Sequence, residues 1–105
     1  MTQETLLKRI KEQLRELYGS RFRGLLLYGS IARGDAGAES DIDLLCLLKG
    51  PVDVTEEVLF VSRKLYPLQL EYLDRVFSIM VADIEDYETG ACPLCIEARK
   101  EGALV

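Results

Sequence analysis

The chain has 105 residues, 49% of them hydrophobic and 30% charged, and a formal net charge of −5. This composition excludes an intrinsically disordered chain, and the length predicts one domain over residues 1–105. The acidic balance makes the surface a poor platform for phosphate backbones, so direct contact with nucleic acid is not expected. No apolar run is long enough to span a membrane, and the odd number of cysteines, three, predicts reduced thiols and a cytoplasmic protein.

The first half of the chain predicts a helix followed by two strands. Residues 2–18 carry apolar side chains at helical spacing with charged ones between them, which indicates an amphipathic helix. Residues 22–28 form a short apolar stretch that is typical of a buried strand. The small, polar residues 35–40 indicate a loop, and a second buried strand is expected over 41–48.

The second half predicts a helix, a strand and two shorter segments. The helix is expected to begin near Thr55 and to end or kink at Pro67, with a continuation to about Tyr72 as the alternative. The remaining expected elements are a third strand over 76–82, a short helical or turn segment over 83–87 and a final helix over 93–100. This order predicts a single α/β domain.

Two aspartates stand at the start of the second expected strand. Asp41 and Asp43 are two residues apart, so in a strand both side chains point to the same face. Two carboxylates at this spacing repel each other unless a cation lies between them. Mg²⁺ suits such a site, because it is typically held by one or two carboxylates together with substrate phosphates and water.

A glycine and a serine follow the first expected strand. At Gly29 the backbone can approach a phosphate closely, and the Ser30 hydroxyl and neighbouring N–H groups can bind phosphate oxygens. Arg33, one turn further on, can contact the same anion. A phosphate-binding segment after one strand and a metal site on the next are the two features that phosphoryl or nucleotidyl transfer requires.

The pattern Gly29-Ser30, ten residues, Asp41-Ile42-Asp43 resembles the signature of the polymerase-β-like nucleotidyltransferase superfamily. The surrounding residues look like those of its small, single-domain members, the minimal nucleotidyltransferases. The resemblance implies an α/β fold with a small mixed sheet flanked by helices. It further implies that Gly29 and Ser30 bind the triphosphate of ATP and that Asp41 and Asp43 hold catalytic Mg²⁺.

The same resemblance implies a third carboxylate on the next strand, which helps to activate the acceptor hydroxyl. Asp74 is the candidate for this catalytic and metal-binding position. If the strand register instead places Ser78 at the catalytic level, the third carboxylate is absent, with Glu71 as a reserve.

Minimal nucleotidyltransferases are often encoded beside a small helical HEPN protein, in pairs similar to toxin–antitoxin systems. The resemblance therefore implies an enzyme that transfers AMP from ATP to a tyrosine of a HEPN toxin. One alternative is a nucleotide-binding antitoxin that acts by forming a complex without transfer. Another is transfer to a small molecule, against which the short chain argues because it offers few residues for an acceptor pocket.

Two further features have competing interpretations. Cys92 and Cys95 have the spacing of a redox or zinc pair. The chain has no histidines and no thioredoxin-like setting, so the spacing is expected to be incidental. The alternative is that these cysteines pair across a dimer interface. The apolar residues between Leu65 and Leu73 are expected to pack in the core, and the alternative is an exposed patch for a partner or for a homo-oligomer.

Overall fold

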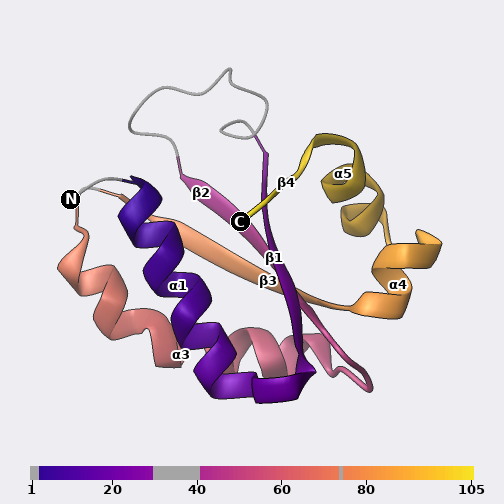
Figure 1. The fold of residues 1–105 in the computed structure, drawn as a ribbon, viewed down its shortest axis with the longest axis horizontal. Helices are drawn as coiled ribbons and strands as arrows, with labels where there is room; N and C mark the ends of the chain where they lie inside the picture. The colour runs from indigo at the N-terminus through magenta and orange to yellow at the C-terminus, as the bar shows by residue number, and fades with distance from the viewer. Residues whose placement is uncertain (1–2, 30–40, 74) are drawn as a thin grey trace.

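The computed structural model describes residues 3–29, 41–73 and 75–105, which form a single sheet with helices on both faces (Figure 1). The elements in chain order are α1 (Gln3–Tyr18), the 3₁₀ turn η1 (Gly19–Arg21), β1 (Phe22–Tyr28), β2 (Ile42–Leu48), α3 (Val54–Glu71), β3 (Phe77–Asp83), α4 (Ile84–Thr89), α5 (Pro93–Glu101) and β4 (Ala103–Leu104). The expected α/β class and the small mixed sheet are confirmed.

The sheet has the strand order β3-β2-β1-β4. Strand β1 runs antiparallel to both β2 and β4, whereas β2 and β3 are parallel. The parallel pair requires a crossover, and α3 makes it. As a result, the starts of β2 and β3 lie at the same end of the sheet, beside the end of β1.

Strand β2 shows how the two faces of the sheet are filled. Ile42, Leu44, Cys46 and Leu48 pack in one cluster with apolar side chains of α1 and α3. The alternate residues Leu45 and Leu47 pack in a second cluster with Cys95 and Ala98 of α5. Every residue of this strand is buried except Asp43, which is half-buried. The strand is therefore a central, two-sided core element, as its nearly continuous apolar sequence predicts.

Burial also controls the chemistry of Cys46 on β2. Its side chain is completely buried, and loss of solvent raises the pKa of the thiol to about 12, with a smaller contribution from the charge of Glu57. This is the only cysteine outside a disulfide in the part of the chain that the structure describes.

Helix α3 begins earlier and continues further than one sequence interpretation suggests. Its first residue is Val54, one before Thr55, and the N-cap Asp53 accepts a hydrogen bond from the N–H of Glu56 (3.2 Å). The helix continues through Pro67 to Glu71, so an end at Pro67 is wrong and the longer alternative is confirmed. The last turn is retained because Leu65 and Leu68 on either side of the proline are anchored in the core.

The apolar residues at the end of α3 divide between core and surface. Leu65, Leu68 and Tyr72 are buried, whereas Tyr66, Leu70 and Leu73 are exposed by 59%, 50% and 78%. Packing in the core is therefore confirmed for part of this segment, and the rest of it is exposed.

The C-terminal region contains two features that the sequence did not predict. Strand β4 pairs with β1, and the N–H of Val105 donates to the carbonyl of Leu25 (2.9 Å). At the start of α5, Cys92 and Cys95 form a disulfide, so the expectations of reduced thiols and of an incidental spacing are wrong for this pair. Their spacing of three residues over one helical turn brings the two side chains together.

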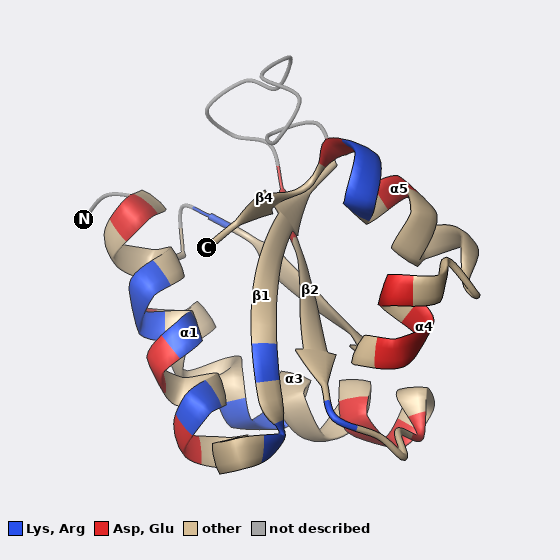
Figure 2. Ribbon diagram, turned by 45° about the vertical axis from the view of Figure 1, so that its right-hand side comes forward, with Lys and Arg blue, Asp and Glu red and all other residues tan. Residues whose placement is uncertain are grey.

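Charge is concentrated on the helices and scarce on the sheet (Figure 2). Basic and acidic side chains alternate along α1, whereas α4 is acidic. Asp43 is the only charged residue of β2. Within the residues that the structure describes, no helix combines the length and the apolar character needed to cross a membrane.

Candidate functional site

The candidate site lies where β1 ends beside the start of β2. Gly29 follows β1 with a φ of +79°, a left-handed conformation that side chains disfavour. A Cβ atom at this position would lie 2.5 Å from Oδ2 of Asp43, which is too close for a real contact. Glycine is therefore required twice, by the backbone conformation and by the close approach to the carboxylate.

The two aspartates of the motif lie at the start of β2. Asp41, one residue before the strand, is exposed, and Asp43 is half-buried within it. Asp43 pairs with Tyr28 on β1 and alternates with the residues of β2 that pack on α1 and α3. It therefore lies on the sheet face that α5 covers further along the strand.

Ser78 lies beside Asp43 on the neighbouring strand. In the parallel register of β2 and β3, Asp43 is the partner of Ser78, and the Ser78 hydroxyl donates a hydrogen bond to Oδ1 of Asp43 (3.3 Å). Of the two arrangements left open by the sequence, the structure thus places Ser78 at the level of Asp43. This hydrogen bond holds the Asp43 carboxylate in one orientation.

The remaining candidates either lie outside the described residues or lie away from this pair. Ser30, Arg33 and Asp74 lie outside the described residues. Glu71, the reserve for the third carboxylate, forms an ion pair with Arg9 of α1 (2.7 Å between Oε2 and Nη1), which places it with the helices on the opposite face of the sheet.

Tyr28 borders the site on the β1 side. It is half-buried and packs against the apolar cluster that β2 forms with Cys95 and Ala98 of α5. Burial raises the pKa of its phenol above the ordinary value, and the charges of Asp43 and Glu97 raise it further. The hydroxyl therefore stays protonated near neutral pH and is not a base.

The oxygen donors at the site fit a magnesium ion that brings its own phosphate ligands. In the described ranges no group of three or more His, Cys, Asp or Glu side chains converges on one point. Two carboxylates and a hydroxyl are nevertheless hard oxygen donors of the kind Mg²⁺ prefers, with phosphates and water completing its shell. With no side chain at Gly29, the backbone approaches the Asp43 carboxylate closely.

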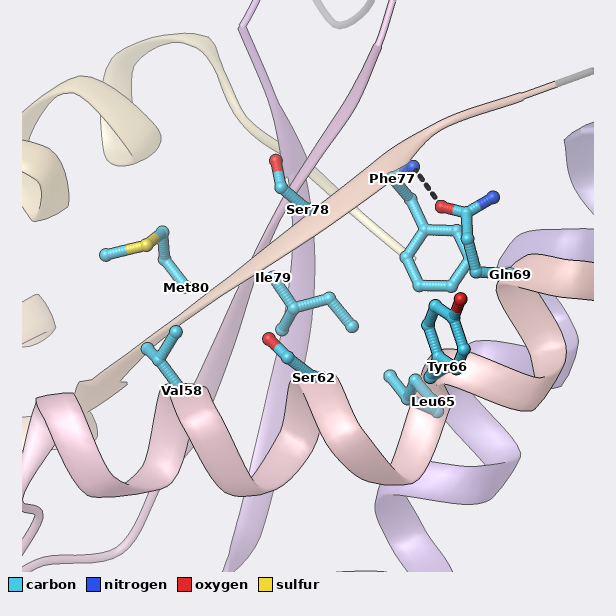
Figure 3. A pocket seen from close by; sticks show the side chains of 9 residues that line it. All are labelled: Val58, Ser62, Leu65, Tyr66, Gln69, Phe77, Ser78, Ile79 and Met80. Carbon is cyan, nitrogen blue, oxygen red and sulfur yellow. Dashed lines mark hydrogen bonds between the residues drawn. The ribbon is translucent and has the colours of Figure 1, made fainter. Parts of the chain in front are cut away.

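A groove of about 300 Å³ lies between α3 and β3, and Figure 3 shows its lining. Nine residues line it: Val58, Ser62, Leu65, Tyr66, Gln69, Phe77, Ser78, Ile79 and Met80. The side chain of Ile79 points toward α3, whereas that of Ser78 points away from it (Figure 3). Neither Asp41 nor Asp43 lines this groove, and Ser78 is the one lining residue that also contacts Asp43.

Gln69 fixes the segment that leads into β3, a role that sequence reasoning missed. Its Oε1 accepts from the N–H of Phe77 (3.0 Å), as the dashed line in Figure 3 shows. Its Nε2 donates to the carbonyls of Arg75 (2.5 Å) and Tyr72 (3.2 Å). A half-buried glutamine with three backbone contacts sets where β3 begins, and hence that Ser78 lies beside Asp43.

We expect Gln69→Ala to lower the free energy of unfolding by about 1–3 kcal/mol, because three backbone groups lose their partner. Urea denaturation followed by circular dichroism measures this difference. Gln13→Ala on α1, which removes the same atoms away from the turn, is the control and should change stability by less than about 0.5 kcal/mol. Equal losses in the two variants would contradict the role assigned to Gln69.

Two comparisons of the sequence find similar proteins. A family model described as a nucleotidyltransferase domain matches residues 7–102. A curated protein of Methanocaldococcus jannaschii, "Putative protein adenylyltransferase MJ0604", is 42% identical over 53 residues, covering 50% of this chain and 51% of that protein. The chain thus matches about half the length of this relative.

Solved structures share the fold at low sequence identity. A crystal structure of "a putative nucleotidyltransferase from Sulfolobus solfataricus" superposes with a TM-score of 0.64 at 22% identity, covering 95% of this chain and 76% of that one. A crystal structure described as a toxin–antitoxin with AMP-PNP gives a TM-score of 0.59 at 19% identity, covering 98% and 72%. A mutant of the toxin–antitoxin MntA-HpeT also gives 0.59 at 19% identity, covering 100% and 72%. At these identities the likeness shows the fold.

Proposed function

Because this chain belongs to the family of nucleotidyltransferase domains, we propose that it transfers AMP from ATP to the hydroxyl of an acceptor. The observation that carries the proposal is the contact between two segments of the motif. Gly29, in a left-handed conformation, lies against the Asp43 carboxylate, with Asp41 exposed two residues away. This arrangement puts a side-chain-free backbone segment beside two carboxylates, where one triphosphate and its cation could contact both.

Each residue of the proposed site has a separate task. The backbone at Gly29, together with Ser30 and Arg33, binds phosphate oxygens, while Asp41 and Asp43 supply anionic ligands for Mg²⁺. Mg²⁺, when bound, neutralises charge on the triphosphate. The acceptor oxygen forms a bond to the α-phosphorus as the bond from that phosphorus to the oxygen bridging to the β-phosphate breaks. Pyrophosphate leaves with the electron pair, and the proton of the acceptor hydroxyl passes to water. Positioning and charge stabilisation are the main contributions of this chain.

The acceptor we propose is a tyrosine on a helical partner protein of the HEPN type, for which this chain is the antitoxin. Two comparisons support a protein acceptor: one relative is named a protein adenylyltransferase, and two neighbours in fold are described as toxin–antitoxin structures. The net charge of −5 also suits a basic partner, since opposite charges favour association.

The test is to incubate the purified protein with Mg²⁺ and ATP, with and without a co-expressed helical partner, and to measure intact masses. A gain of one AMP unit on the partner, dependent on Asp41 and Asp43, supports the proposed enzyme and its acceptor. No AMP on the partner, despite binding of ATP and a stable complex, would contradict transfer.

A second candidate function is an antitoxin that binds nucleotide and neutralises its partner by occlusion. Ser78 favours it, because a hydroxyl stands beside Asp43 where a carboxylate would assist transfer. The same mass measurement separates the two, since occlusion predicts protection from the toxin without a change in mass.

A further inference from the structure

The first turn of α5 carries a disulfide that the proposed function does not use. Cys92 and Cys95 are its two members, and they differ in environment. Cys92 is partly exposed, with exposed residues on either side of it, whereas Cys95 has no exposed surface. Cys95 packs in the apolar cluster with Leu45 and Ala98. An external thiol can therefore approach the pair from the Cys92 side, and the core shields the Cys95 side.

The fold of this turn does not depend on the bond between the two sulfur atoms. Cys92 is the N-cap of α5, and its Sγ accepts a hydrogen bond from the N–H of Cys95 (3.1 Å). Its carbonyl accepts from the N–H of Ile96 (3.1 Å), and Pro93 occupies the start of the helix, where no N–H is needed. These interactions are available to a thiolate as well as to a disulfide, so α5 is compatible with both redox states.

The disulfide is also a weak structural cross-link. A disulfide stabilises a protein mainly by restricting the unfolded chain, and this effect grows with the length of the closed loop. Here the two cysteines are only three residues apart. Helix α5 has other attachments, among them the packing of Ala98 and the hydrogen bond from Arg99 Nη1 to the carbonyl of Glu88 (2.8 Å). Reduction of the pair therefore leaves most of what holds α5 in place.

The start of a helix favours a thiolate, because its free N–H groups and its dipole stabilise negative charge. At Cys92 this position coincides with partial exposure and with a buried second cysteine one turn away. We propose that Cys92 and Cys95 form a thiol–disulfide exchange site, in which Cys92 bonds to an external thiol and Cys95 is the resolving sulfur. This activity goes beyond the proposed nucleotidyl transfer and does not depend on it.

The exchange proceeds in two steps with an external monothiol as reductant. Its thiolate attacks Cys92 Sγ, the bond between the two cysteines breaks, and Cys95 Sγ leaves with the electron pair and takes a proton from water. A second external thiolate then attacks the external sulfur of the mixed disulfide and releases Cys92 as a thiolate. Two external thiols thus lose two electrons and become one disulfide, and the protein gains the two electrons.

The test compares two variants that each keep one member of the pair, Cys95→Ala and Cys92→Ala. Each folded variant is incubated with glutathione disulfide, and its intact mass is followed over time. Cys95→Ala should gain one glutathione through Cys92, whereas Cys92→Ala should react at least about tenfold more slowly because its remaining cysteines are buried. Both variants retain the buried Cys46, so its reactivity is the same in the two and cancels in the comparison.

Equal rates in the two variants, or no adduct on Cys95→Ala, would overturn the assignment of Cys92 as the exchanging sulfur. If either variant fails to fold by circular dichroism, the wild-type chain decides in buffers of varied glutathione and glutathione disulfide. Alkylation and intact mass should then show one equilibrium fraction of reduced pair, reached from the oxidised and from the reduced protein, while the circular dichroism stays native. A pair that stays oxidised until the chain unfolds, or that glutathione disulfide never oxidises, would overturn the proposal.

Discussion

Replacing Asp41 and Asp43 together by asparagine should lower the rate of AMP transfer by about 10³-fold or more while the fold is retained. Asparagine keeps the shape of the side chain, and its amide oxygen can still accept the hydrogen bond from Ser78. Both negative charges that would hold the cation are lost, so the triphosphate loses its neutralising partner. Initial rates with labelled ATP and circular dichroism measure the two effects separately.

A matched control for this variant changes two acidic residues of α4. Glu85→Gln with Asp86→Asn alters the net charge equally, but α4 follows the far end of β3 and lies away from Asp43. We expect its transfer rate to stay within about twofold of wild type, because exposed charges beyond a Debye length are screened. Equal loss in both variants would mean that overall charge matters, and undiminished transfer in the Asp41/Asp43 variant would remove the metal assignment.

Gly29→Ala should destabilise the protein by about 1–3 kcal/mol and weaken Mg·ATP binding by a larger factor than its stability loss explains. The backbone at Gly29 has a φ of +79°, and the added Cβ would lie 2.5 Å from Asp43 Oδ2. The Asp43 carboxylate must therefore move, and the added methyl group crowds the proposed phosphate site. Thermal unfolding should show a drop of roughly 4–8 °C per kcal/mol lost, and calorimetric titration at a temperature where both proteins are folded measures nucleotide affinity.

Gly19 provides the control, because it also has a positive φ (+55°) but no atom within 4 Å of an added Cβ. Gly19→Ala should therefore reproduce the backbone cost without any effect on nucleotide affinity. If Gly29→Ala and Gly19→Ala both leave affinity unchanged, the contact between Gly29 and Asp43 has no part in the binding site.

The sequence predicts the elements whose signal is local. The strand over 22–28 is confirmed at its predicted limits, and β2 and α5 are confirmed within one residue, because their apolar patterns and terminal residues are strong signals. Gly29 and Asp43 also lie beside each other, because the antiparallel register places the end of β1 at the start of β2.

The parts that escaped prediction depend on contacts between distant residues. The register of β3 follows from the Gln69 side chain, which no periodicity in the sequence reveals, and it decides whether Ser78 or another residue lies beside Asp43. Strand β4 has two residues, too few for a pattern, and exists because β1 offers it a free edge. The roles of Ser30, Arg33 and Asp74 stay predictions.

Alkylation of Cys46 can report when the core around β2 opens. Alkylating reagents attack thiolates that they can reach, and this thiol is completely buried with a pKa raised to about 12. Because Cys92 and Cys95 are paired, a single added label on the oxidised chain would mark a molecule in which the core around β2 had separated. The labelling rate with and without nucleotide, read from intact mass, would then report how far ligand binding holds the core closed.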